Sequence, residues 1–165
     1  MITYRQAKFD DVEKIHKLLN DYAKAGLMLP RSRNAIYENL RDYIVAMQGS
    51  HLVGCGALHF VWDRLAEIRS LAVDPELKCT GIGKNIVALL EKEGIERGVK
   101  MFFTLTYQPG FFAKCSYIET AKEKLPQKVW KECVYCPQYP YCNEIAFVKT
   151  TVDYQPGDIL FQNFA

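Results

Sequence analysis

The sequence has no hydrophobic run approaching the roughly 20 residues that a helix needs to cross a bilayer. Its first residues, MITYRQAKFDD, also lack the apolar stretch of a signal peptide. No block of like charges stands out, and the formal net charge is only +2. A nucleic-acid-binding arm or a membrane-surface patch would need such a block. We therefore expect a cytoplasmic protein whose partners are small molecules, with no nucleic-acid or membrane partner.

Histidine is scarce, and this bears on a possible metal site. Cys133, Cys136 and Cys142 cluster late in the chain, and thiolates at such spacing suit tetrahedral zinc. A fourth ligand is lacking, since all three histidines lie before residue 60. Without a secretory signal, cysteines are typically reduced thiols. We therefore expect no bound metal and interpret the cluster as buried or adventitiously oxidised cysteines, with zinc as the alternative.

The chain also lacks internal repeats, low-complexity tracts and interdomain linkers. With 165 residues, 49% of them hydrophobic, it is long enough to bury one core. Periodicity and turn residues predict the order β-α-α-β-β-β-α-β-α-β. The expected segments are 2–6, 12–22, 36–40, 43–47, 51–59, 66–73, 82–98, 101–106, 111–115 and 144–151. This α/β pattern predicts a single domain over 1–150 and an extended C-terminal tail over 151–165.

The best-marked helix opens on Gly81-Ile82-Gly83, directly after a strand that ends at Pro75. Two glycines at a helix N-terminus expose backbone N–H groups and the positive end of the helix dipole to a phosphate. Ile86 stands where a dinucleotide-binding motif would have its third glycine, and no G-x-x-x-x-G-K-[ST] run exists. A pyrophosphate of another kind is therefore expected, with a purely structural turn as the alternative.

The segments 71–75 and 78–83 together resemble the acetyl-CoA signature of the GNAT acetyltransferases. The resemblance implies the GNAT fold, a mixed and mostly antiparallel central sheet with helices on both faces. It also implies acetyl-CoA as co-substrate, with strand backbone groups of Leu71 and Val73 on its pantetheine arm. The implied cofactor-binding residues are Leu71, Ala72, Val73, Lys78, Cys79, Thr80, Gly81, Ile82, Gly83, Lys84 and Phe112.

A narrower resemblance connects the chain with the amino-acid acetyltransferases of the N-acetylglutamate synthase group. It is carried by the segments 28–32, 53–59, 67–73, 105–107, 111–112 and 125–130. It implies transfer of an acetyl group to the α-amine of L-glutamate or L-glutamine, in arginine biosynthesis. The long enzymes of that group carry an amino-acid kinase domain before the acetyltransferase. This chain begins directly with the acetyltransferase, so arginine feedback through such a domain is not expected.

Amine attack on a thioester needs a proton acceptor, because an α-ammonium group is mostly protonated at neutral pH. By the resemblance Glu67 is that general base, and regular alternation would put it on one face with Arg69 and Leu71 unless a bulge intervenes. Thr106 matches a hydroxyl that would protonate or steady the departing thiolate, with Tyr107 in reserve. Many GNAT enzymes use a tyrosine where this chain has Phe112. Solvent-exposed glutamate and ordinary strand threonine are the alternatives.

A carboxylate-bearing substrate calls for arginine, whose planar fork binds carboxylates in pairs. Arg31 aligns with a glutamate-binding arginine of the group, Arg69 and Arg33 are further candidates, and Ser70 could contribute a hydroxyl. The region 139–143 lacks a second arginine of the long synthases, which leaves the amino acid open.

Two other functions remain open at this level. The chain could acetylate another primary amine, such as a polyamine, an aminoglycoside or a protein N-terminus. It could also be a non-catalytic acyl-CoA sensor, in which Glu67 is dispensable. GNAT domains often pair, so a homodimer is possible.

Overall fold

A computed structural model of the chain describes residues 1–125 and 143–159. It contains two compact units. Unit 1 comprises Met1–His59 and Ile68–Glu93, and unit 2 comprises Phe60–Glu67 and Gly94–Ala165. Cys133, Cys136 and Cys142 lie outside the described residues, as does most of the matched segment 125–130, so the cysteine interpretation stays a prediction.

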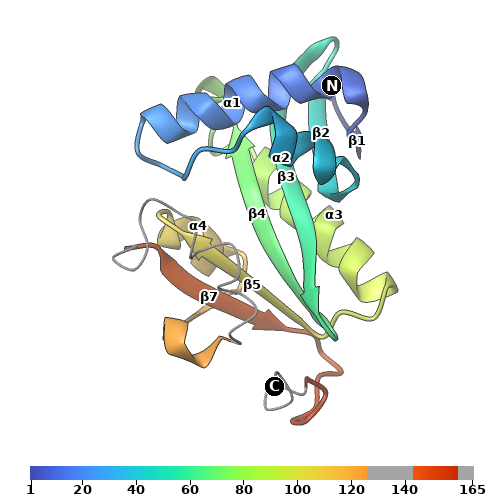
Figure 1. The fold of residues 1–165 in the computed structure, drawn as a ribbon, viewed down its shortest axis with the longest axis vertical. Helices are drawn as coiled ribbons and strands as arrows, with labels where there is room; N and C mark the ends of the chain where they lie inside the picture. The colour runs from blue at the N-terminus through green and yellow to red at the C-terminus, as the bar shows by residue number, and fades with distance from the viewer. Residues whose placement is uncertain (126–142, 160–165) are drawn as a thin grey trace. The chain divides into compact units, whose positions relative to one another are not determined.

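The observed elements follow the predicted order, with one short strand added near the end (Figure 1). The strands are β1 (Ile2–Gln6), β2 (Tyr43–Gln48), β3 (His51–Trp62), β4 (Leu65–Val73), β5 (Met101–Thr106), β6 (Ile118–Thr120) and β7 (Ile145–Thr150). The α-helices are α1 (Val12–Lys24), α2 (Arg33–Glu38), α3 (Ile82–Glu96) and α4 (Pro109–Lys114). The 3-10 turns are η1 (Phe9–Asp11), η2 (Leu40–Asp42), η3 (Pro75–Leu77) and η4 (Lys122–Lys124). Among the described helices, none is both long and apolar enough to cross a membrane.

Hydrogen bonding orders the strands of the described residues as β1-β2-β3-β4-β5-β7-β6. β1 pairs with β2 and β2 with β3 in antiparallel fashion, and β7 pairs antiparallel with both β5 and β6. The parallel pair is β4 with β5, in which Glu67 lies opposite Phe103. The predicted mixed, mostly antiparallel sheet is therefore confirmed.

Side chains alternate along β3, so the strand has two faces. In unit 1, one face contacts α1 and α2 and the other contacts α3. Cys55 and Ala57 face a buried cluster that α1 and α2 complete with residues such as Ile15 and Ile36. The glycines between and before them face α3: a Cβ on Gly56 would lie 2.7 Å from Ile86 Cγ2. A Cβ on Gly54 would likewise lie 3.0 Å from Ile82 Cγ2 of α3. Glycine at these two positions allows α3 to pack directly on the β3 backbone.

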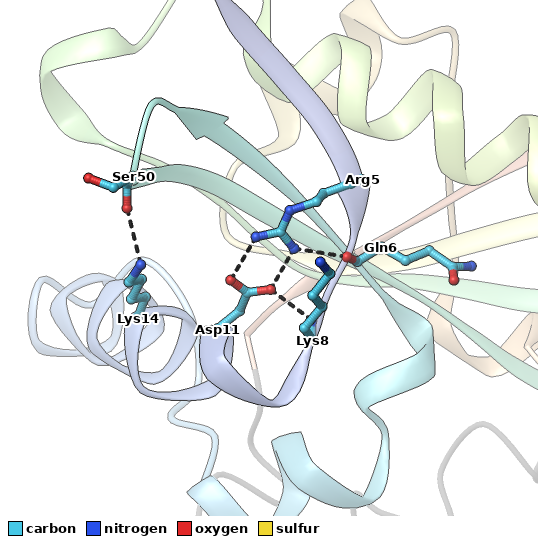
Figure 2. A network of polar contacts seen from close by, with 6 residues as sticks. All are labelled: Arg5, Gln6, Lys8, Asp11, Lys14 and Ser50. Atoms are coloured by element: carbon cyan, nitrogen blue, oxygen red, sulfur yellow. Dashed lines mark hydrogen bonds and ion pairs between the residues drawn. The ribbon is translucent and has the colours of Figure 1, made fainter.

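A buried carboxylate connects β1 to the start of α1 (Figure 2). Asp11 accepts two hydrogen bonds from the Arg5 guanidinium, at 2.7 and 3.0 Å, and a third from the Lys8 backbone N–H at 2.7 Å. No side-chain cap bond forms at the N-cap Asp11 of α1, and Glu13 in the first turn pairs with Arg33. The residue that bonds a backbone N–H at this turn is Asp11.

The apolar loop before α2 packs onto unit 1. Leu27 and Met28 lie against the cluster formed with α1 and α2, which explains large apolar side chains in a loop. Ser32 then caps α2, because its Oγ accepts a hydrogen bond of 3.1 Å from the Ala35 N–H. The helix therefore begins at Arg33, three residues before the predicted start.

Unit 2 has its own buried cluster, formed by Leu65, Phe103, Leu125, Ala146 and Ile159. Ile159 belongs to the segment that follows β7, where the chain makes turns rather than extending. Those turns begin with a bond from Thr151 N–H to the Lys100 carbonyl at 2.9 Å, and Lys100 Nζ lies 2.5 Å from Asp153. Residues 151–159 are therefore folded onto unit 2.

Candidate functional site

The turn between β4 and α3 has the backbone geometry of an anion cradle. Gly81 has φ +91°, a conformation that L side chains rarely adopt, and a Cβ there would meet nothing within 4 Å. Cys79 is also left-handed, with φ +64°, and both it and Lys78 are exposed. The free N–H groups of the first turn of α3 follow directly. The backbone at this turn is therefore compatible with a pyrophosphate, and the binding predicted from the sequence stays a prediction.

The end of β4 is bonded by a side chain of α1. Tyr22, which is 5% exposed, accepts a hydrogen bond of 3.2 Å from the Val73 N–H and donates one of 2.6 Å to the Val73 carbonyl. Lys78 Nζ lies 5.2 Å from the centre of the Tyr22 ring. Burial raises the pKa of Tyr22, so its hydroxyl stays neutral and able to donate. Both backbone groups of Val73 that were expected to meet the cofactor are engaged by Tyr22.

Ser70 lies inside β4 with φ +55°, so the strand is irregular there. The expected alternation from Glu67 through Arg69 to Leu71 is therefore interrupted. Two neighbouring strands hold this residue. Tyr43 of β2 donates a hydrogen bond of 3.2 Å to Ser70 Oγ, and the Cys55 thiol of β3 donates one of 3.5 Å to the Ser70 carbonyl. A left-handed serine in a strand costs conformational energy and persists only where its surroundings determine it.

Two arginine side chains act electrostatically on the Tyr43 hydroxyl. Burial raises the pKa of Tyr43, and the opposing influences are the bond to Ser70 and then the charges of Arg31 and Arg69. Both guanidinium groups therefore lie within electrostatic reach of that hydroxyl, and both arginines are partly exposed. Arg33 is exposed and pairs with Glu13 at 2.7 Å. Within unit 1, Arg31 and Arg69 thus both act on the hydroxyl that bonds Ser70.

His59 of β3 forms a polar contact with the turn η2. His59 Nδ1 lies 2.8 Å from Asp42 Oδ2, and both side chains are mostly buried. This contact gives His59 a structural role between β3 and the turn η2.

The expected catalytic residues lie in unit 2. Glu67 is partly exposed on β4 opposite Phe103, and Thr106 is the last residue of β5, 8% exposed. Thr106 Oγ1 accepts a hydrogen bond of 2.8 Å from the Gln108 N–H, which leaves the hydroxyl proton for another acceptor. Phe103 shares a buried cluster with Leu65, so alternation assigns Glu67 to their face and Thr106 to the opposite one. The two groups do not share one face of the strands.

Phe112 is 4% exposed on α4, where its ring meets Phe111 and Tyr117 edge to face, with centroids 5.1 and 5.4 Å apart. It stabilises the contact between α4 and the chain that follows. Its expected contact with the cofactor stays a prediction.

Sequence reasoning missed the three side chains that hold β4, namely Tyr22, Tyr43 and Cys55. The local sequence around each of them indicates only a buried helix or strand residue. The polar atoms that they meet lie 15 to 51 residues away in the chain, so no local motif records the contact.

Sequence comparisons with known proteins identify the family of the chain. The acetyltransferase (GNAT) family matches residues 12–117. An uncharacterized N-acetyltransferase of Chlorobaculum tepidum is 43% identical over 146 residues, which are 88% of this chain and 94% of that protein. An amino-acid acetyltransferase of Mycobacterium tuberculosis is 34% identical over 131 residues, covering 78% of this chain and 75% of that protein.

Solved structures show the same fold. The N-acetylglutamate synthase of Neisseria gonorrhoeae, complexed with coenzyme A and N-acetyl-glutamate, superposes with a TM-score of 0.82 at 24% identity. That match covers 91% of this chain and 35% of the synthase chain. A Mycobacterium tuberculosis protein in complex with CoA and a second ligand gives a TM-score of 0.79 at 27% identity, covering 91% and 99%.

The chain therefore belongs to the GNAT acetyltransferase family. It is an acetyltransferase, and acetyl-CoA is its acetyl donor. The predicted family, fold class and cofactor are thereby confirmed.

Proposed function

We propose that this enzyme acetylates the α-amine of a small amino acid, most favourably L-glutamate or L-glutamine, as a cytoplasmic step of arginine biosynthesis. The observation that carries the proposal is that Arg31 and Arg69 both act electrostatically on the Tyr43 hydroxyl, which is bonded to Ser70. A carboxylate is the natural partner of such a group, whereas a polyamine would be repelled. The relatives named amino-acid acetyltransferase support the same acceptor class.

The chemistry is a direct transfer. The neutral amine attacks the thioester carbonyl, a C–N bond forms, the C–S bond breaks and CoA leaves as a thiolate. In this proposal Glu67 accepts the amine proton, directly or through water. Thr106, whose oxygen already accepts the Gln108 N–H, supplies a hydroxyl proton to the thiolate. The amine nitrogen and the thiolate sulfur are bonded to the same carbon, so the proposal requires both side chains to reach one reaction centre, although alternation assigns them to opposite faces of the strands.

The donor would be held by the turn before α3. Backbone N–H groups from Cys79 to Lys84 would meet the pyrophosphate, and the exposed Lys78 and Lys84 would add charge. Strand groups of Leu71 to Val73 would meet the pantetheine arm. At Val73 this requires Tyr22 to share or release its two hydrogen bonds.

A thiol-release assay with acetyl-CoA against all twenty amino acids tests the acceptor class. We expect turnover with glutamate or glutamine and none with polyamines. Arg31→Ala should raise the KM for the amino acid about 10-fold or more, because a charge-assisted carboxylate contact is lost. Arg33→Ala is the matched control, since Arg33 is occupied at the surface by Glu13. Turnover with polyamines alone, or equal effects of the two variants, would contradict the proposal.

A further inference from the structure

We propose that Tyr43 is a positioning residue: its hydroxyl fixes the Ser70 hydroxyl as a hydrogen-bond donor to a carboxylate of the amino-acid acceptor. This inference deepens the function proposed above and rests on it. It adds a substrate-selecting role for a buried tyrosine on β2 and for the Tyr43–Ser70 pair as a unit.

The hydrogen bond between the two hydroxyls carries the first step. Tyr43 is 2% exposed and donates to Ser70 Oγ at 3.2 Å. A serine hydroxyl that accepts one hydrogen bond still has its own proton to give. Because burial raises the pKa of Tyr43, the tyrosine remains a donor throughout the pH range of an enzyme assay. Ser70 is thereby left to act as donor toward a third group.

The backbone of Ser70 carries the second step. Its φ of +55° is unusual for a strand residue, and the Cys55 thiol holds its carbonyl from β3 while Tyr43 holds its hydroxyl from β2. Burial raises the pKa of Cys55 to about 12, so this thiol also stays a neutral donor. One donor thus holds Ser70 from the adjacent strand β3 and the other from β2, the next strand beyond it. Such over-determined strain is typical of residues that must present a group in one orientation.

The charge around the pair identifies the third group. Arg31 and Arg69 act electrostatically on the Tyr43 hydroxyl, and Ser70 is partly exposed beside it. A neutral donor bonded to a hydroxyl on which two cations act suits an anion that accepts several hydrogen bonds, and a carboxylate has about four lone-pair sites. A cationic or apolar acceptor gains nothing from this arrangement. The geometry therefore points to a carboxylate of the amino acid.

The test compares Tyr43→Phe, Ser70→Ala and the double variant by steady-state kinetics with the amino acid that the parent enzyme uses. We expect each single variant to raise the KM for the amino acid about 3- to 10-fold, the range for one lost hydrogen bond, with the KM for acetyl-CoA unchanged. The double variant should be no worse than Ser70→Ala within about 2-fold, since both changes remove the same contact. If Tyr43→Phe folds poorly, Ser70→Ala still tests the contact, because it removes the same hydrogen bond at its partly exposed partner.

Tyr37→Phe is the control, because Tyr37 is an exposed tyrosine of α2 whose ring contacts Phe9. It should leave both KM values unchanged. A purely structural Tyr43 would lower the melting temperature, leave the ratio of the two KM values unchanged and add its effect to that of Ser70→Ala; this result overturns the inference. An active parent with an unaffected Tyr43→Phe also overturns it, while the proposed function stands. A parent that acetylates no amino acid overturns the proposed function and this inference together.

Discussion

The carboxylate that connects β1 to α1 gives a stability prediction whose size follows from its contacts. Asp11→Asn removes the negative charge but keeps the shape of the side chain. In the folded protein the carboxylate accepts two bonds from Arg5 and one from the Lys8 N–H, and its side chain is 4% exposed (Figure 2). Hydrogen bonds to a charged group contribute about 1.5–3 kcal/mol each. Asparagine keeps one oxygen for one of the three bonds, and Arg5, at 36% exposure, regains water.

We therefore expect Asp11→Asn to lower the free energy of unfolding by about 2–3 kcal/mol at pH 7. In urea denaturation this corresponds to a midpoint lower by roughly 1 M. The bond to Arg5 is the main cause that lowers the pKa of Asp11 in the folded state. The carboxylate thus stabilises the protein above its unfolded pKa of about 4. This contribution is lost as the pH falls through the folded pKa.

The difference between parent and variant should accordingly be full at pH 7 and shrink below about pH 4. Asp21→Asn is the control, because Asp21 forms an exposed pair with Lys17 at 2.7 Å and such pairs contribute little. A difference equal at pH 7 and pH 3 would assign the loss to packing instead of charge. Equal urea midpoints for parent and Asp11→Asn at pH 7 would refute the reasoning.

Two further predictions concern the reaction. Gly81→Val should weaken CoA binding at least about 10-fold, measured by thermal stabilisation with CoA, because the new side chain would enter the open space at the cradle; Gly49→Val, equally left-handed and equally open, should not. Glu67→Gln should lower turnover about 10²- to 10⁴-fold at neutral pH with CoA affinity kept, and part of the loss should recover at high pH, where the amine arrives deprotonated. Near-normal turnover of Glu67→Gln with chemistry rate-limiting would reject Glu67 as the base.

Most of the fold could be predicted because its elements carry local signals. The apolar stripe of α3 between its glycines, and the three strands β2 to β4 separated by short turns, were placed within a few residues. β6 was missed because three residues are too few for periodicity to show. α2 was shifted because Ser32 was not recognised as its cap.

The candidate site was less predictable, because resemblance supplies residue positions and not their neighbours. Arg31, Arg69 and Ser70 were proposed from the sequence, and in unit 1 all three act on the Tyr43 hydroxyl, Ser70 through a hydrogen bond and the arginines through their charge. Tyr43 itself carried no signal beyond that of a strand aromatic. The regular strand assumed between Glu67 and Leu71 also hid the left-handed Ser70, since serine is not a residue that marks such a backbone.

The side chains that bond β4 are expected to have a different role from Asp11, which stabilises the fold. Tyr22 from α1, Tyr43 from β2 and Cys55 from β3 all direct polar groups at the segment from Ser70 to Val73, within unit 1. Each of these side chains is buried, and an aliphatic residue could fill the same volume without a hydroxyl or thiol. We therefore infer that their polar groups are present to form hydrogen bonds with β4 and not to fill the core. Loss of Asp11 should act on stability alone, whereas loss of the hydroxyls around β4 should alter substrate affinity in a protein that still folds.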